Sequence, residues 1–320
     1  MNPSSPTAAS HPARPTPSAV RGRALITGLR GFTGSYLAQE LEADGYEVFG
    51  TAHGNEELAN NIFAVDLCDR QRLNEVIADV RADVVFHLAA IANVAHDDIE
   101  VIYHTNLIGT HNLLQALAAN DHAPRAVLLA SSANIYGNAT VEPIDEQVVA
   151  RPENDYAVSK SAMEKMARLW QNILPLTIVR PFNYTGVGQS ESFLLPKIVA
   201  HFRRQASVIE LGNLDVARDF SDVRTVVGAY RRLVQTAAPG QTFNVCSGCG
   251  YSLQEVIDML QRIAGYEIEV RINPAFVRAN EVKRLVGSNA KLLDAIGELT
   301  PISLHETLTW MYQEEPMVNF

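Results

Sequence analysis

Cysteine is scarce in this chain of 320 residues, which contains Cys68, Cys246 and Cys249 and no others. A small, odd count is a poor disulfide framework and suits a reducing compartment, so we expect a cytoplasmic protein. Cys246 and Cys249 form a C-x-x-C pair, but no second Cys pair or His pair lies at ligand spacing. Because structural zinc requires four ligands, we expect no metal site.

Long apolar runs and an excess of positive charge are also missing. No apolar run reaches the roughly 18 residues that cross a bilayer, so we expect no membrane span. The formal net charge of −10 argues against a nucleic-acid-binding surface, and an anionic substrate would have to meet a local basic pocket. Residues 1–22 are rich in Pro, Ser, Ala and Thr and lack the apolar segment of a signal peptide. We therefore expect a disordered tail without a role in the chemistry.

What the sequence does contain is an alternation of short apolar runs and helical patterns. Strands that are apolar throughout and alternate with helices indicate a parallel sheet covered on both faces. Right-handed crossovers then give an α/β doubly wound (Rossmann) sheet of the kind that binds nucleotides. The predicted strands are 24–27, 46–51, 62–65, 83–88, 126–130 and 176–179, and the predicted helices are 32–44, 69–80, 99–120, 156–172 and 195–205.

After Pro181 the pattern becomes irregular, which indicates a smaller lobe for the substrate. We assign residues 23–180 to a dinucleotide-binding domain, to which residues 217–245 return. The segments 181–216 and 246–320 form the predicted C-terminal α/β substrate-binding lobe.

A glycine-rich turn lies between the first predicted strand and the first predicted helix. Gly28, Gly31 and Gly34 form the pattern G-x-x-G-x-x-G. Glycine permits the tight turn and the close approach of a pyrophosphate, while the helix N-terminus supplies N–H donors and a positive dipole end. In this context the loop predicts a bound dinucleotide.

The end of the second strand indicates which dinucleotide binds. An acidic residue there would accept hydrogen bonds from an NAD ribose and repel a 2′-phosphate. No acid follows this strand until Glu56, whereas Arg30 and His53 could face the phosphate. NADP(H) is therefore favoured, and NAD(H) remains possible.

Three side chains predict acid–base chemistry on a ketone or alcohol. Tyr156 and Lys160 lie four residues apart, on one face of a predicted helix, and Ser132 lies just past a buried strand. A nearby Lys ammonium and an oxidised nicotinamide both favour the phenolate and lower the pKa of the phenol. The phenol can then exchange a proton with a ketone or alcohol oxygen. We predict that Ser132 hydrogen-bonds the same oxygen, because ligands bind at the carboxyl ends of such sheets.

These motifs, taken in order, make the chain similar to the extended short-chain dehydrogenases/reductases over nearly all of residues 24–312. Further matching pieces are Asp66-Leu67, His87-Leu88-Ala89-Ala90, Asn106 in N-x-x-G-T, and Arg180-Pro181-Phe182-Asn183. The resemblance implies that Asp66 and Leu67 meet the adenine, that Asn106 braces the strand and helix, and that Lys160 bonds the nicotinamide ribose. It also implies a homodimer formed through helices 101–120 and 156–172. The predicted cofactor-binding residues are Gly28, Arg30, Gly31, Phe32, Gly34, His53, Asp66, Leu67, Leu88, Ala89, Ala90, Asn106, Tyr156, Lys160 and Phe182.

A narrower resemblance, to GDP-4-dehydro-6-deoxy-D-mannose reductases, covers the substrate lobe. It rests on R-P-F-N-Y-T-G-V-G-Q from residue 180, L-G-N-L-D-V-A-R-D-F from 211, N-V-C-S-G from 244 and G-S-N from 287. The resemblance implies that Asn183 touches the sugar diphosphate, that Arg218 and Arg278 neutralise phosphate charge, and that Glu281 binds the nucleotide ribose. It implies a GDP-linked sugar as the substrate.

One difference from the related sugar-nucleotide 4,6-dehydratases limits which reactions we expect this chain to catalyse. Those enzymes carry an Asp-Glu pair after the catalytic hydroxyl, where this chain has Ala133-Asn134. Without that acid and base, dehydration has no obvious catalyst, so we expect reduction of a 4-ketone or epimerisation. Reduction would give GDP-D-rhamnose from one face or GDP-6-deoxy-D-talose from the other. A third alternative, a non-catalytic NADP-binding protein, would be expected to lack Tyr156 or Lys160.

Overall fold

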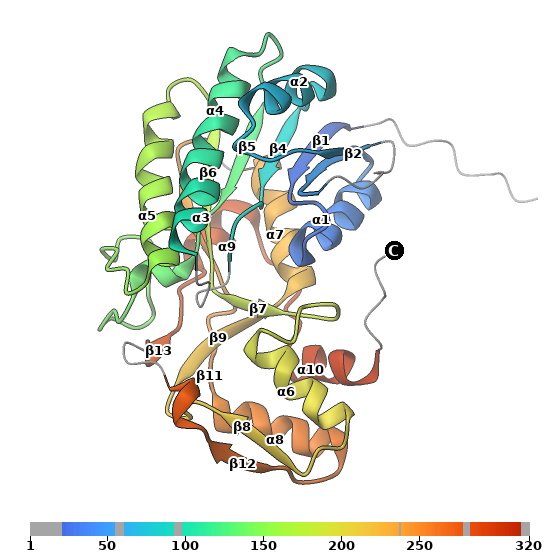
Figure 1. Cartoon of the computed structure of the whole chain (residues 1–320), viewed down its shortest axis with the longest axis vertical. Helices are drawn as coiled ribbons and strands as arrows, with labels where there is room; N and C mark the ends of the chain where they lie inside the picture. The colour runs from blue at the N-terminus through green and yellow to red at the C-terminus, as the bar shows by residue number, and fades with distance from the viewer. Residues whose placement is uncertain (1–20, 55–60, 93–97, 237, 278–281, 315–320) are drawn as a thin grey trace, which may run out of the picture.

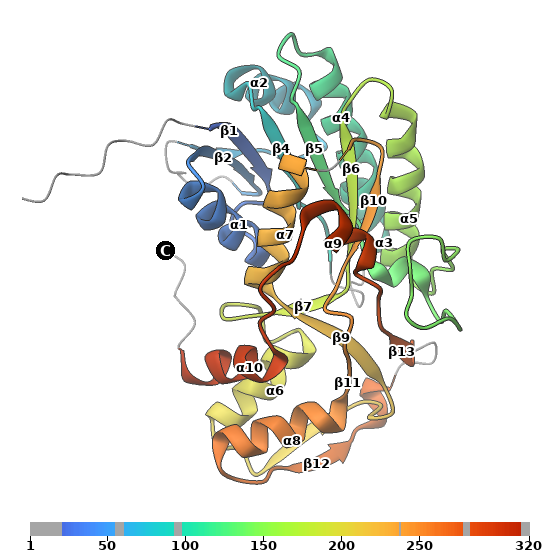
Figure 2. The same cartoon turned by 180° about the vertical axis from the view of Figure 1, so that it is seen from behind.

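The computed structural model describes residues 21–54, 61–92, 98–236, 238–277 and 282–314. These form a larger α/β lobe and a smaller lobe beneath it (Figures 1 and 2). Of the predicted tail, residues 1–20 lie outside the described residues. Strand β1 begins at Gly22, the last residue of the segment predicted as tail.

A parallel sheet of seven strands, counted over the described residues, forms the centre of the larger lobe. The sheet confirms the predicted doubly wound fold, because the strand order reverses on either side of β1 and β4 and every pair is parallel. In spatial order the strands are β10 (Thr242–Val245), β6 (Leu176–Pro181), β5 (Ala126–Ala130), β4 (Val84–His87), β1 (Gly22–Thr27), β2 (Tyr46–Ala52) and β3 (Ile62–Ala64).

Helices cover both faces of this sheet because the central strands are apolar on both sides. Along β5, Val127 and Leu129 enter one apolar cluster, and Leu128 between them enters the other. Helices α1 (Phe32–Ala43), α7 (Val223–Thr236) and α9 (Ala290–Ile296) pack on one face, and α2 (Arg70–Val80), α4 (Thr110–Ala119) and α5 (Asp155–Ala167) pack on the other.

The long helix predicted over residues 99–120 contains a π-helical turn. It consists of α3 (Ile99–Tyr103), the π-helical segment η1 (His104–Gly109) and α4. Asn106 lies inside the π-helical turn and is fully buried. Such turns often occur at functional sites, because they redirect one side chain without ending the helix.

The smaller lobe has its own apolar core between helices α6 (Leu194–Arg203), α8 (Leu253–Ala264) and α10 (Leu304–Gln313). Leu195, Phe202, Ile257 and Leu308 are among the side chains buried there. The elements of this lobe are β7 (Asn183–Thr185), α6 (Leu194–Arg203), β8 (Val208–Leu211), β9 (Ala217–Asp222), β11 (Gly250–Ser252), α8 (Leu253–Ala264), β12 (Glu269–Ile272), β13 (Arg284–Leu285) and α10 (Leu304–Gln313).

Two boundaries between the lobes differ from the sequence prediction. The segment 217–245 was assigned to the large lobe, but β9 at its start pairs with β7, β11 and β13 in the second sheet. The return to the main sheet therefore begins with α7. Conversely, α9 lies within the segment 246–320 but packs with α7 and β10 in the larger lobe through Leu292 and Ile296.

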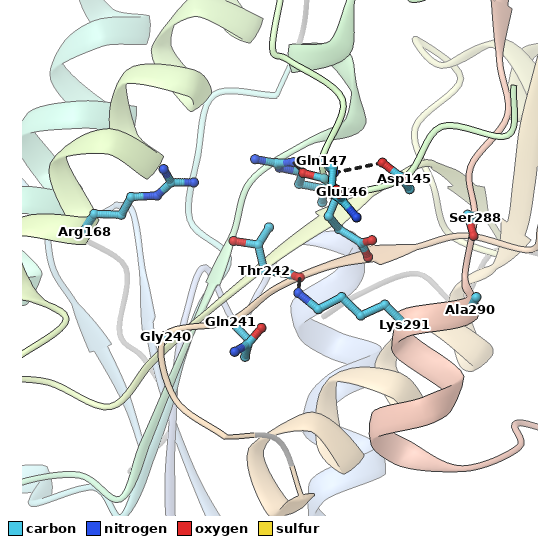
Figure 3. Close-up of a pocket in the computed structure, with 11 residues that line it drawn as sticks. Asp145, Glu146, Gln147, Arg168, Gly240, Gln241, Thr242, Ser288, Ala290 and Lys291 are labelled. Atoms are coloured by element: carbon cyan, nitrogen blue, oxygen red, sulfur yellow. Dashed lines mark hydrogen bonds between the residues drawn. The ribbon is translucent and has the colours of Figure 1, made fainter. Parts of the chain in front are cut away.

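The outer edge of β10 is covered by charged side chains. Lys291 Nζ donates a hydrogen bond to the Thr242 carbonyl at 2.8 Å, and the Asn244 N–H donates to Glu146 Oε1 at 2.6 Å. The side chains of Lys291 and Glu146 line a pocket of about 530 Å³ beside this edge (Figure 3). Ser132, Tyr156 and Lys160 are not among the residues that line it.

Candidate active site

The carboxyl ends of the parallel strands face the smaller lobe (Figures 1 and 2). Because parallel strands end at the same edge of a sheet, this arrangement brings the glycine loop after β1, Ser132 after β5 and Asn183 after β6 to one side of the molecule. This is the edge at which open α/β sheets bind ligands.

The glycine loop has the geometry of a phosphate cradle. Gly28 has φ of +76°, and a Cβ there would lie 3.0 Å from the Ala89 backbone. A Cβ on Gly34 would collide with the Gly28 carbonyl oxygen. No side chain caps the N-terminus of α1, and its first turn contains no acidic residue. The loop therefore fits a dinucleotide pyrophosphate, since it leaves helix N–H groups and the positive dipole end to an anion.

The three predicted catalytic side chains come together at the end of β5. Tyr156 and Ser132 share a side-chain hydrogen bond. Ser132 Oγ also accepts the Asn134 N–H at 3.1 Å, which starts a short 3-10 turn. Lys160 is 3% exposed, and its Nζ donates to the Ala130 carbonyl at 2.8 Å. The phenol, hydroxyl and ammonium are thus held by the strand end and by one face of α5.

Burial decides the pKa of Tyr156 in the protein by itself. We predicted that Lys160 and an oxidised nicotinamide together lower it. In the protein by itself, burial raises the pKa of Tyr156 to about 12, with the Ser132 hydrogen bond acting in the lowering direction. Burial lowers the pKa of Lys160 to about 8, against the charge of Glu164, which raises it. At neutral pH the phenol is therefore protonated, and in this form it can give a proton to an oxygen anion.

Helix α5 begins after a capping residue and is fixed in its last turn by a buried ion pair. The Asn154 side chain accepts the Ala157 N–H, which sets the start of the helix before Tyr156. The Arg180 guanidinium of β6 donates to both carboxylate oxygens of Glu164, at 2.9 and 2.7 Å. We assigned no role to Glu164 from the sequence, although its position four residues after Lys160 places it on the catalytic face of the helix.

The segment after β4 is held against the same helix. The Asn106 side chain accepts from the Ile91 N–H at 2.8 Å and donates to the Ile91 carbonyl at 3.1 Å. It also donates to Ser159 Oγ at 3.0 Å, and Ser159 donates to the Tyr156 carbonyl at 2.7 Å. Asn106 thus connects the strand end with the catalytic helix.

The remaining residues predicted to bind the cofactor range from exposed to buried, with Leu88, Ala89 and Ala90 half-buried. Arg30 and His53 are exposed, in the glycine loop and after β2. Asp66 accepts the Cys68 N–H, and Leu67 is buried. Phe182 is 4% exposed and packs in a cluster with Cys246. The thiols of Cys246 and Cys249 are free, the first buried and the second exposed.

On the substrate side, the structure describes three of the five residues predicted for the nucleotide sugar, namely Ser132 after β5, Asn183 and Arg218. Asn183 Nδ2 donates to the Asp219 carbonyl at 3.4 Å. Arg218 Nη1, from β9, donates to the carbonyls of Ala217 and Lys283 at 3.0 and 3.1 Å. Arg278 and Glu281 lie outside the described residues.

Contacts between α1 and β7 join the cofactor side to the substrate side. Thr33 Oγ1 and the Tyr184 hydroxyl form a hydrogen bond of 2.7 Å. The Tyr36 hydroxyl donates to the Val187 carbonyl at 2.8 Å, and the Phe32 ring stacks on Tyr184. The first turns of α1 therefore contact the segment that follows Asn183 directly.

The described residues contain neither a membrane-spanning helix nor a cluster of metal ligands. No helix there is long and apolar enough to cross a membrane. Nowhere in these ranges do three or more His, Cys, Asp or Glu side chains gather closely enough to hold a metal ion.

Comparisons with known proteins agree with this geometry. The family model described as "NAD dependent epimerase/dehydratase family" matches residues 24–246. The chain is 35% identical over 274 residues to GDP-6-deoxy-D-talose 4-dehydrogenase from Aggregatibacter actinomycetemcomitans, covering 85% of this chain and 90% of that protein. It is 35% identical over 297 residues to GDP-6-deoxy-D-mannose reductase from Pseudomonas aeruginosa, covering 89% and 94%.

Two solved structures are similar over almost their whole length. A protein of Burkholderia cenocepacia J2315, provisionally described as an epimerase, is 54% identical with a TM-score of 0.87, covering 92% of this chain and 97% of that one. RMD from Pseudomonas aeruginosa, complexed with NADPH, is 34% identical with a TM-score of 0.81, covering 91% and 97%.

Proposed function

The chain belongs to the NAD dependent epimerase/dehydratase family, and from this premise we propose that it uses NADPH to reduce the 4-keto group of a GDP-linked 4-dehydro-6-deoxy sugar. The observation that carries the proposal is the placement of the buried Tyr156 phenol beside Ser132 at the ligand-binding edge of the sheet. The two curated relatives that act on GDP-6-deoxy sugars support this substrate class.

In the proposed reaction a bound NADPH supplies the hydride that converts the C4 ketone into an alcohol. Ser132 hydrogen-bonds the C4 oxygen and holds it beside Tyr156. As negative charge develops on that oxygen, Tyr156 donates its phenolic proton to it, so the product is a neutral hydroxyl. Lys160, held at the Ala130 carbonyl, places its positive charge next to the phenolate that remains.

NADPH is proposed rather than NADH on two grounds. No acidic residue follows β2 until Glu56, while Arg30 and His53 are exposed at the adjoining loops. In addition, the similar RMD structure from Pseudomonas aeruginosa is complexed with NADPH.

For the sugar nucleotide we propose Asn183, Arg218, Arg278 and Glu281 as binding residues. Asn183 and Arg218 lie on β7 and β9, which pair with each other directly. A diphosphate bound beside these strands would receive a charge-assisted hydrogen bond from the guanidinium of Arg218. The acidic chain would thereby present positive charge where the substrate is most negative.

A homodimer is proposed through the helices predicted to form it. Val101, Ile108 and Val158 are 39%, 44% and 38% exposed, although all three are large apolar side chains. They lie on α3, η1 and α5, which contact one another. Burying this surface against a second copy would remove it from water.

The test of the reaction is to incubate the protein with GDP-4-dehydro-6-deoxy-D-mannose and NADPH and to identify the product by NMR. We expect one NADPH to be oxidised for each sugar reduced, giving GDP-D-rhamnose or GDP-6-deoxy-D-talose. No conversion of the ketone by the folded protein would exclude the proposal.

An epimerase with tightly bound NAD is the second candidate, favoured by the 54% identical protein provisionally described as an epimerase. An epimerase returns the hydride to the same substrate and therefore consumes no NADPH. Interconversion of sugar nucleotides without net NADPH oxidation, by protein that retains NAD through purification, would establish this alternative.

A further inference from the structure

His87, at the end of β4, is a buried titratable residue that the proposed chemistry does not use. It is 1% exposed, and both ring nitrogens have a hydrogen-bond partner. Nδ1 lies 2.7 Å from Thr27 Oγ1 of β1, and Nε2 lies 2.8 Å from Thr110 Oγ1 of α4. The imidazole thus spans the space between the central strand and the helix that covers it.

The direction of each hydrogen bond follows from the partners at the two ends. Thr110 Oγ1 donates its proton to the Asn106 carbonyl at 2.8 Å, because a carbonyl can only accept. Thr110 must therefore accept from His87, so Nε2 carries the ring proton. Nδ1 is then an acceptor and receives the hydroxyl proton of Thr27, whose oxygen accepts the Ala89 N–H at 3.3 Å.

This order of donors and acceptors admits one neutral tautomer of His87. A charged imidazole would place a second N–H against the Thr27 hydroxyl, which would lose its acceptor. Burial and the nearby charge of Lys160 act in the same direction, because they lower the pKa of His87 to about 3.

The hydrogen bonds of His87 connect three segments of the candidate site. Thr27 directly precedes Gly28 and binds Ala89 in the segment proposed to line the cofactor. At the other end, the Asn106 side chain hydrogen-bonds both the N–H and the carbonyl of Ile91. It also bonds Ser159 of α5, which in turn bonds the Tyr156 carbonyl. One continuous chain of hydrogen bonds therefore runs from the glycine loop to the catalytic tyrosine.

From this chain we infer that His87, as a single neutral tautomer, is a positioning residue that fixes the segment 88–91 between the glycine loop and the catalytic helix. The inference rests on the proposed function in one respect, namely that NADPH binds along this segment. A histidine that only filled the core would need no particular tautomer, and its replacement would affect stability rather than cofactor binding.

The first test is the tautomer itself, measured by ¹⁵N NMR on labelled wild-type protein, with the His87→Gln spectrum to assign the signals. We expect a protonated Nε2 and an unprotonated Nδ1 at pH 7, unchanged at pH 5.5. A ring protonated at Nδ1, or an imidazolium at pH 5.5, would overturn the inference whether or not the protein binds NADPH.

The second test compares variants by calorimetry with NADPH and with GDP. His87→Leu removes both hydrogen bonds, and His87→Gln keeps one donor and one acceptor. Because unsatisfied buried partners displace the segment, we expect His87→Leu to weaken NADPH binding about tenfold or more and His87→Gln to recover most of it. GDP binding should change less than about twofold in both. Wild-type protein that fails to bind NADPH would count against the proposed function instead.

Two further variants separate positioning from stability. Thr307→Val removes a fully buried hydroxyl that bonds Asp222, and we expect it to lower the melting temperature without changing NADPH binding. Thr110→Val removes the acceptor of Nε2 with little change of shape, and it serves if His87→Leu does not fold. NADPH affinity equal to wild type in Thr110→Val and in any folded His87→Leu would refute the positioning role.

Discussion

In the proposed reaction, Tyr156 must hold a proton at neutral pH and release it to a developing alkoxide. We expect Tyr156→Phe to retain NADPH binding but to lower turnover by about two orders of magnitude or more, the usual contribution of general acid catalysis. Steady-state kinetics and NADPH titration measure the two effects. Turnover close to that of wild type would exclude Tyr156 as the proton donor.

His87 makes stability depend on acidity. The unfolded chain takes up a proton at this imidazole near pH 6.5, whereas the folded chain does so near pH 3. Between these values the unfolded state binds more protons, so the free energy of unfolding falls as the pH falls, by about 3 kcal/mol at pH 4. Urea unfolding between pH 7 and pH 4 should show this loss in wild type and a smaller loss in His87→Gln. Parallel losses in the two proteins would mean that other groups dominate.

The residues of the candidate site could be predicted from the sequence where spacing and order carry the information. Ser132, Tyr156 and Lys160 were found in this way, and the structure brings them together. The direction of the pKa shift of Tyr156 could not be found, because it depends on burial, which the Y-x-x-x-K pattern does not reveal. The roles inferred for Glu164 and His87 depend on partners 16 and 60 residues away, Arg180 and Thr27.

At the scale of elements, the position of α5 on the sheet depends on the ion pair between Glu164 and Arg180. Their side chains are 4% and 7% exposed, so the loss of one partner leaves a buried charge. We expect Glu164→Gln to lower the free energy of unfolding by about 3–5 kcal/mol, as measured by urea unfolding. The double variant Glu164→Leu/Arg180→Met should recover much of that loss.

The matched control for this prediction is the exposed pair between Glu269 and Arg271 on β12. These side chains are 58% and 59% exposed, so solvent screens their attraction. Glu269→Gln should leave the free energy of unfolding almost unchanged. An equal effect of the two substitutions would show that burial does not decide the strength of the Glu164 pair.

The elements themselves were predictable to different degrees. Apolar strands alternating with amphipathic helices predicted the main sheet, because both of its faces must be covered. The membership of β9 and α9 was not predictable, since it depends on which lobe each segment packs against. The π-helical turn at Asn106 also leaves no periodic signal, because one widened turn hardly alters the spacing of apolar residues in a long helix.

At the scale of the whole molecule, the two lobes are expected to bind different ligands. We predict that Arg218→Ala weakens GDP binding about ten- to a hundredfold, the loss of one charge-assisted hydrogen bond, while NADPH binding stays nearly constant. Calorimetry with each ligand measures both affinities. Arg271→Ala, which removes an exposed guanidinium from the same lobe, is the control and should change neither. Unchanged GDP binding in Arg218→Ala would place the diphosphate elsewhere, and equal weakening of both ligands would indicate misfolding.

The course of the chain between the lobes has a consequence for biosynthesis. Leu292 and Ile296 of α9 complete the core of the larger lobe, and Leu304, Leu308 and Met311 of α10 complete that of the smaller lobe. These residues leave the ribosome after every described strand of both lobes. Neither core can therefore close fully before α9 and α10 have been synthesised, and a nascent chain stalled before residue 290 leaves apolar surface of both lobes open to chaperones.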